Sequence, residues 1–304
     1  MTRTLRAVSA PAKLNLHLQV MGKRGDGYHE LRTLYQSIDL MDEVRGSVGT
    51  DGDIKLTTVP EGSVPAGGGN LVMRAATALR ERTETHLGAE LELRKSIPVG
   101  SGLGGGSADA AATLVLLESL WNLDLEPGAL AGIASEIGAD VPFFLFGGLA
   151  WGTGRGDEIH PLPDMENCAV LVCLPEIEAI TADVFSEHAN RLTSHEADGR
   201  VSAFVEGRAK PPWACFFNDL EGLVTGKWPE IDRALGALRA THPLHSGVTG
   251  SGAAVFGVYS DAGAALDAAQ DLDDNWRFHV GSTLGRAESE LVARRVETRE
   301  EDRE

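Results

Sequence analysis

The sequence has few cysteines, few positive charges and no long apolar segment. Its three cysteines, Cys168, Cys173 and Cys215, are odd in number and lack CxxC spacing, which favours reduced thiols in the cytosol over disulfides or a zinc site. The apolar stretch 141–154 is interrupted by glycines and too short to span a bilayer, and Lys13 interrupts the N-terminal region before a signal-peptide core can form. We therefore expect a cytoplasmic protein without a membrane anchor.

Positive charge is scarce, because 45 Asp and Glu residues outnumber 27 Lys and Arg residues and leave a formal net charge of −18. Such a surface repels nucleic-acid phosphates and anionic lipids, so we expect neither as a partner. It also repels phosphorylated small molecules, so a phosphate site must obtain positive potential locally, from backbone N–H groups, a few cations or Mg²⁺. The length of 304 residues and the 42% hydrophobic content fit a globular protein of about two domains.

The first segments of the chain show the two-residue period of β-strands. Apolar residues on even positions of 8–20 predict a half-buried strand, followed by an Asp-Gly hairpin turn and a returning strand or two within 31–44. The opposite face of the first strand carries Lys13, Asn15, His17 and Gln19. Later segments predict a helix capped by Asn70.

A change of character near residue 160 predicts two lobes, 1–160 and 161–304. The second lobe is expected to contain a buried strand at 168–174, helices near 181–192 and 229–241, and a glycine-rich turn at 249–252 that leads into another strand. The highly charged end from about Arg294 predicts a frayed tail.

The most informative segment is a glycine-rich loop between a strand and an Ala- and Leu-rich helix that continues to Trp121. Five glycines in this loop indicate that the backbone approaches a ligand closely or takes positive φ angles; they are Gly100, Gly102, Gly104, Gly105 and Gly106. Exposed N–H groups and a helix N-terminus near Ser107, with Ser107 as its cap, predict a phosphate site.

The glycine loop also allows two alternatives, a dinucleotide site and a loop that serves only tight packing. Gly100, Gly102 and Gly105 match the dinucleotide fingerprint of oxidoreductases, but the loop lies a third of the way along the chain, without an acid after a second strand. A Walker-type P-loop is excluded, because the sequence has no GxxxxGK[ST] motif.

Three ordered segments resemble the motifs of GHMP kinases, the superfamily of galactokinase, homoserine kinase and mevalonate kinase: 10–16, 98–108 and 247–256. Within it, segments 26–31, 138–143, 154–157 and 218–221 resemble the diphosphocytidyl-methylerythritol kinase branch. The resemblance implies an α+β fold of two lobes with the active site between them. The N-terminal lobe would be like domain 2 of ribosomal protein S5, and the C-terminal lobe would be ferredoxin-like.

The resemblance also implies an enzyme that uses ATP and Mg²⁺ to phosphorylate the methylerythritol 2-hydroxyl of a small-molecule substrate carrying a cytidine diphosphate group, in the non-mevalonate isoprenoid pathway. We expect a monomer or a weak homodimer. The alternatives are another GHMP kinase, acting on mevalonate, homoserine or a sugar, and a non-catalytic GHMP-fold binding protein, which should have lost Lys13, Asp140 or the glycine loop.

Each implied site residue could also have a purely structural role. Asp140, expected at an element boundary, could accept the proton of the substrate hydroxyl, although helix-end aspartates are common. Lys13 could pair with Asp140 and neutralise the γ-phosphate, or be a solvated lysine. Tyr28 and His29 could contact the cytosine, or simply pack the hairpin. We interpret His17 as structural.

The remaining assignments follow the matched motifs. The expected ATP-binding residues are Pro98, Val99, Gly100, Ser101, Gly102, Leu103, Gly104, Gly105, Gly106, Ser107 and Ala108, with Ser107 also a candidate magnesium ligand. The expected substrate-binding residues are Asn15, Tyr28, His29, Thr181, Phe185, Thr249, Gly250 and Ser251.

Overall fold

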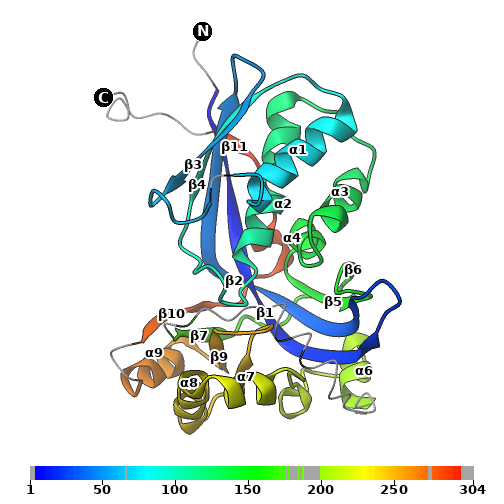
Figure 1. Cartoon of the computed structure of the whole chain (residues 1–304). Coiled ribbons are helices and arrows are strands. Elements are labelled where there is room, and N and C mark those ends of the chain that lie inside the picture. The colour runs from blue at the N-terminus through cyan, green and yellow to red at the C-terminus, as the bar shows by residue number, and fades with distance from the viewer. Residues whose placement is uncertain are drawn as a thin grey trace.

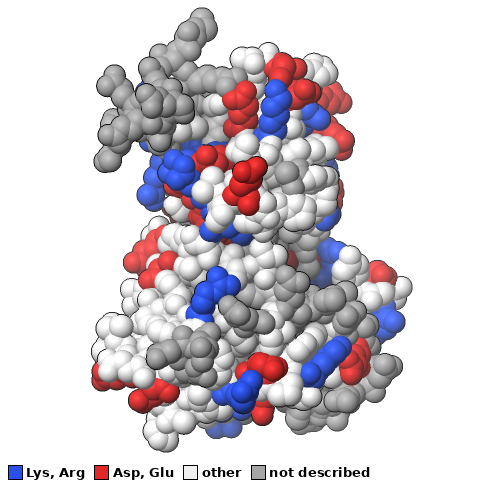
Figure 2. Space-filling view, turned by 60° about the vertical axis from the view of Figure 1, so that its left-hand side comes forward, with Lys and Arg blue, Asp and Glu red and all other residues white. Residues whose placement is uncertain are grey.

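The structure is a computed structural model with two lobes, each built on one β-sheet (Figure 1). It describes residues 4–65, 67–175, 177, 184, 187, 199–272 and 276–295. In the space-filling view the lobes meet at a narrower waist, and acidic side chains lie among basic ones over both lobes (Figure 2). Within the described residues, no helix has both the length and the apolar character needed to cross a membrane.

The N-terminal lobe contains a seven-stranded sheet with helices packed on one face (Figure 1). Its path is β11-β1-β2-β4-β3, with β5 beside β2 and β6 beside β5. The strands are β1 (Arg6–Lys23), β2 (His29–Val48), β3 (Ile54–Val59), β4 (Ala89–Arg94), β5 (Leu149–Thr153), β6 (Glu158–Pro161) and β11 (Arg294–Arg295). The helices are α1 (Leu71–Thr83), α2 (Gly105–Trp121), α3 (Ala129–Ile137) and α4 (Val141–Phe146).

The C-terminal lobe contains a four-stranded antiparallel sheet in the order β10-β7-β9-β8, with α7, α8 and α9 packed below it in Figure 1. The strands are β7 (Ala169–Leu174), β8 (His245–Val248), β9 (Val255–Tyr259) and β10 (Arg277–Ser282). The helices are α6 (Gly199–Val205), the short 3-10 turn Trp213–Cys215, α7 (Glu221–Lys227), α8 (Pro229–Ala240) and α9 (Ala262–Gln270). The short helix α10 (Arg286–Ser289) follows β10 and contacts the N-terminal lobe, where Ser289 Oγ accepts from the N–H of Gly148. The predicted α+β fold of two lobes is confirmed.

Strand β1 is buried on both faces, so the prediction of a half-buried strand is wrong. Its apolar face packs partly against the second lobe, where Leu14 and Leu16 share a core with Phe256. Its polar face is covered by the glycine loop and by the turn after β8, since both contact Lys13 or Asn15. Alternation along a sequence identifies the apolar face but does not show that a second lobe covers the other one.

Several expected element bounds also differ from the structure. The returning segment, expected as a strand or two within 31–44, is one longer strand, β2 (His29–Val48). Asn70 caps α1 through its side chain as predicted. The cap assigned to Ser107 is wrong, because α2 already begins at Gly105 after an N-cap at Gly104. Its N-terminus is therefore made by the glycine loop itself.

The chain crosses to the second sheet after β6 and returns to the first at its end. The lobe boundary near residue 160 stays a prediction, although β6 ends at Pro161 and β7 begins at Ala169. The expectation of a frayed tail does not hold for Arg294 and Arg295, which pair with β1 as β11. The expected helix at 181–192 falls largely outside the described residues.

Candidate active site

A cavity of about 930 Å³ lies between the glycine loop, the polar side of β1 and the loops that follow β5 and β8. It collects residues that are far apart in the sequence, including Lys13, Tyr28, Asp140 and Ser251. Its lining also includes apolar side chains from the segment before α1 and from its first turn, such as Val64 and Leu71. This single cavity is large enough for two substrates of moderate size.

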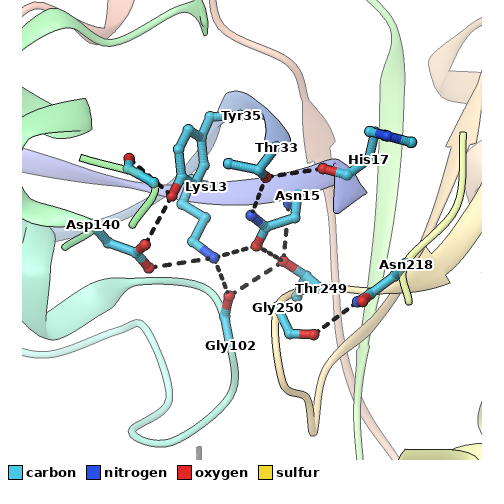
Figure 3. Close-up of polar contacts among 11 residues, drawn as sticks. Lys13, Asn15, His17, Thr33, Tyr35, Gly102, Asp140, Asn218, Thr249 and Gly250 are labelled. Atoms are coloured by element: carbon cyan, nitrogen blue, oxygen red, sulfur yellow. Dashed lines mark hydrogen bonds and ion pairs between the residues drawn. The ribbon is translucent and has the colours of Figure 1, made fainter. Parts of the chain in front are cut away.

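Lys13 is buried in the centre of this site (Figure 3). Its ammonium donates hydrogen bonds to Asn15 Oδ1 and, at 2.8 Å, to the carbonyl of Gly102. Its Nζ lies 3.7 Å from Asp140 Oδ2, as an ion pair rather than a hydrogen bond. Burial lowers the pKa of Lys13, while the negative charge of Asp140 acts in the opposite direction.

Asn15 connects both lobes at the site. Its side chain donates to Thr33 Oγ1 at 2.8 Å, and its backbone N–H donates to Thr249 Oγ1 at 3.1 Å. A β-bulge between Asn15 and His17 shifts the register of β1 against β2, as is common beside functional sites. Asn15 and Lys13 therefore both reach the cavity, as the sequence predicted, and Thr249 from the C-terminal lobe holds Asn15 there.

Asp140 is the N-cap residue of α4, but its side chain makes no capping hydrogen bond. The structure thus does not use this carboxylate as an ordinary helix-end aspartate. Its Oδ1 accepts a hydrogen bond of 2.9 Å from the hydroxyl of Tyr35, and its Oδ2 faces Lys13 (Figure 3). The side chain of Asp140 is 36% exposed whereas that of Lys13 is 3% exposed, so a bound molecule can reach the carboxylate.

The glycine loop packs tightly against the C-terminal lobe. Gly102 has a φ of +79°, and a Cβ there would lie 2.2 Å from the carbonyl oxygen of Thr249. The backbone carbonyl of Ser101 accepts from the N–H of Ala254 at 2.9 Å. The expectation of positive φ angles in this loop is therefore confirmed, and the close approach of Gly102 is to the other lobe.

Most of the predicted loop residues line the cavity, namely Pro98, Val99, Gly100, Ser101, Gly102, Gly104, Gly105, Gly106 and Ser107. Leu103 and Ala108 are fully buried and do not line it. Gly250 and Ser251 lie on the opposite side, and Asn218 donates hydrogen bonds to the carbonyls of Val248 and Gly250 that hold this turn. Two glycine-rich turns, one from each lobe, thus face one cavity.

Tyr28 and His29, at the end of the β1–β2 hairpin, line the same cavity. Tyr28 is 53% exposed, and the guanidinium of Arg155 lies 4.9 Å from the centre of its ring. Arg155 is itself held by Asp157 and by the carbonyl of Ser135. Pure hairpin packing does not account for such an exposed ring. Thr181 and Phe185 lie outside the described residues, so their assignment stays a prediction.

His17 is surrounded by Trp151, Phe216 and Phe217, and burial lowers its pKa to about 4. This agrees with its interpretation as a structural residue.

A buried charged cluster below the glycine loop was missed by the sequence analysis. Lys95, which follows β4, pairs with Asp42 of β2 and, at 2.8 Å, with Asp109 of α2. Asp42 also accepts the backbone N–H groups of Ser96 and Ile97 at 2.6 and 2.8 Å, where the chain enters the loop. Burial raises the pKa of Asp109 to about 8, against the attraction of Lys95. Through the bonds from Asp42 to the backbone of Ser96 and Ile97, the cluster anchors the start of the glycine loop.

No group of three or more His, Cys, Asp or Glu side chains that could hold a metal ion occurs among the described residues. The hydroxyl-bearing Ser107 lines the cavity in the first turn of α2. A single hydroxyl fits magnesium only when a nucleotide and water supply the other oxygen ligands.

Comparison with known proteins agrees with this geometry. Two family models match the chain: the GHMP kinases N terminal domain over residues 70–148 and the GHMP kinases C terminal domain over 216–277. A 4-diphosphocytidyl-2-C-methyl-D-erythritol kinase of Burkholderia thailandensis is 37% identical over 291 residues, covering 93% of this chain and 96% of its own. The chain belongs to the 4-diphosphocytidyl-2-C-methyl-D-erythritol kinase family.

Another relative and two solved structures are also similar to this chain over most of its length. The family's protein from Cupriavidus taiwanensis is 40% identical over 273 residues, covering 90% of each chain. A crystal structure of a 4-(cytidine 5'-diphospho)-2C-methyl-D-erythritol kinase has a TM-score of 0.76 and 34% identity, covering 92% of this chain and 99% of its own. A homoserine kinase from Cytophaga hutchinsonii has the same TM-score at 21% identity, covering 96% and 98%, which shows the shared fold alone.

Proposed function

We propose that the protein is a kinase that transfers the γ-phosphoryl group of ATP to the 2-hydroxyl of 4-diphosphocytidyl-2-C-methyl-D-erythritol, giving the 2-phosphate and ADP in the non-mevalonate isoprenoid pathway. The observation that carries the proposal is the approach of Lys13 and Asp140 in one cavity beside the glycine loop. The substrate is inferred from the family, because relatives that are 36–40% identical to this chain are named 4-diphosphocytidyl-2-C-methyl-D-erythritol kinases. The exposed Tyr28 ring beside Arg155 suits a cytosine and its diphosphate.

In the proposed reaction, the 2-hydroxyl oxygen attacks the γ-phosphorus while the bond from that phosphorus to the β,γ-bridging oxygen breaks, and ADP leaves. The hydroxyl proton passes to the Asp140 carboxylate, whose Oδ2 is the oxygen not bonded to Tyr35. Lys13 lies near this oxygen, so its positive charge would stabilise the negative charge that builds up on the transferred group. Positioning and charge, rather than covalent chemistry, are what this reaction requires of the protein.

Magnesium would arrive with ATP, and Ser107 is the protein ligand that we propose for it. Bound magnesium neutralises phosphate charge, which matters in a protein of net charge −18. Glycine-loop N–H groups and the N-terminus of α2 would hold the phosphates. Cytoplasmic location and a monomeric or weakly dimeric state stay predictions from the sequence.

The test is ADP release by the purified protein with Mg·ATP and, separately, the cytidyl substrate, mevalonate, homoserine or galactose. We expect rapid turnover with the cytidyl substrate alone. Asp140→Asn and Lys13→Met should each lower turnover by roughly 10²-fold or more while the folded structure persists, as checked by circular dichroism. Turnover with another acceptor would overturn the substrate assignment, and full turnover in both variants would overturn the catalytic one.

The alternative of a non-catalytic binding protein predicts no ADP release with any of the four acceptors. The retention of Lys13, Asp140 and the glycine loop in one cavity argues against it. An oxidoreductase would instead bind a dinucleotide tightly, which a fluorescence titration with NADH can exclude.

A further inference from the structure

We propose that Tyr35 is a positioning residue for the phosphoryl transfer: its hydroxyl holds Oδ1 of Asp140 and thereby turns Oδ2 toward Lys13 and the acceptor hydroxyl. This inference rests on the proposed function. Tyr35 belongs to none of the segments that resemble family motifs, so nothing in the sequence indicated it.

The contacts of Tyr35 define its role. Its hydroxyl lies 2.9 Å from Asp140 Oδ1 and 3.3 Å from the carbonyl oxygen of Gly156. A phenol has one proton to donate, and the shorter distance and the negative charge make the carboxylate the better acceptor. Asp140 is thus left with one oxygen occupied and one oxygen, Oδ2, available on the side of Lys13 (Figure 3).

The surroundings of Tyr35 leave its hydroxyl little freedom. Its side chain is buried, and its ring stacks on Phe143 of α4 with centroids 4.7 Å apart. A Cβ at Gly156 would lie 2.6 Å from the hydroxyl oxygen, and one at Gly152 would lie 2.7 Å from the ring. Since Asp140 is the N-cap of α4, the stacked pair fixes the phenol relative to the same helix that presents the carboxylate.

Electrostatics keep this tyrosine a donor. Burial, followed by the negative charge of Asp140, raises the pKa of Tyr35 well above its ordinary value, and Asp157 acts in the same direction. The phenol therefore stays protonated at neutral pH and can donate its proton to the Asp140 carboxylate.

Other charged groups reach the same cavity and could also influence turnover. They are Lys13 and Lys23 from β1, His29 from β2, Arg155 from the turn after β5, and Lys95 and Asp109 from the cluster below the glycine loop. All of them are unchanged in a Tyr35→Phe variant, which removes one oxygen atom. A matched comparison can therefore isolate the hydroxyl.

The control is Tyr259→Phe. Tyr259 is also buried, and its hydroxyl pairs with Thr241 Oγ1 at 2.6 Å in the C-terminal lobe. Both variants lose one tyrosine hydroxyl and its hydrogen bond, but only Tyr35 touches Asp140.

The experiment measures kcat and KM of wild type and both variants with Mg·ATP and the cytidyl substrate. We expect Tyr35→Phe to lower kcat about tenfold or more with KM changed by less than about twofold, because the hydroxyl acts on the transition state rather than on binding. Tyr259→Phe should keep the kcat and KM of the wild type.

A double-mutant cycle separates positioning from a structural effect. In an Asp140→Asn background, Tyr35→Phe should cause no further loss of kcat, because the carboxylate it holds is already gone. Equal losses of kcat in both backgrounds, or an unchanged kcat in Tyr35→Phe, would overturn the inference while leaving the kinase activity intact. Absence of turnover by the wild-type protein would instead refute the proposed function. If Tyr35→Phe does not fold, Gly156→Ala, which pushes on the same hydroxyl, takes its place.

Discussion

Gly102 and Gly100 form a natural pair for testing how the glycine loop is held. Both have positive φ angles, +79° and +70°, so an alanine at either position carries the cost of a left-handed backbone, about 1–2 kcal/mol. A Cβ at Gly100 would meet nothing within 4 Å, whereas one at Gly102 would lie 2.2 Å from the carbonyl oxygen of Thr249. The contact atom is backbone of the other lobe and cannot rotate away.

We therefore expect Gly102→Ala to lower the free energy of unfolding by about 1–3 kcal/mol more than Gly100→Ala does, since overpacking adds to the backbone cost. Urea denaturation followed by tryptophan fluorescence measures both midpoints. Gly102→Ala should also slow turnover by about tenfold or more, because the Gly102 carbonyl accepts from Lys13 and would be displaced with the loop. Equal midpoints for the two variants would refute the claim that the loop is braced against the second lobe.

The remaining predictions concern the buried cluster and the cytidyl side of the cavity. Lys95→Met should destabilise the fold by about 3–5 kcal/mol in urea denaturation, because it leaves the Asp42 carboxylate buried without its cation. Burial raises the pKa of folded Asp109 from 3.8 to about 8, so its contribution to stability is greatest below pH 3.8 and is lost as the pH rises toward 8. Asp109→Asn should flatten that part of the profile, and an unchanged slope would contradict the assignment. Arg155→Ala should raise KM for the cytidyl substrate about two- to fivefold through the loss of its contact with the Tyr28 ring, while KM for ATP stays constant.

The sequence indicates candidate site residues where a short motif contains several unusual residues. Five glycines in a short loop can be recognised without a structure, and the segments around Lys13 and Asp140 carry enough resemblance to assign them. The structure brings all three into one cavity. Strand β7 was also expected, because 168–174 has the apolar run of a buried strand and β7 is buried along most of its length.

What the sequence could not show are contacts between isolated residues on different elements. Lys95, Asp42 and Asp109 lie on three separate segments, and each alone looks like an ordinary surface charge. Tyr35 lies in the middle of β2, where the sequence gives no sign that its hydroxyl meets Asp140. Strand β1 was misjudged for a related reason, because burial of its polar face depends on loops some 90 and 230 residues away.

The pairing of β11 with β1 has a consequence for synthesis of the chain. Strand β1 is made first and carries Lys13 and Asn15, yet its outer edge at Arg6 and Ala7 is covered only when Arg294 and Arg295 have been translated. The hydrogen bond from the N–H of Asn15 to Thr249 likewise forms only after Thr249 has been translated. On the ribosome, the N-terminal sheet would therefore present an open edge at Arg6 and Ala7 until nearly the entire sequence has emerged, whereas Lys13 gains its contact with Gly102 much earlier.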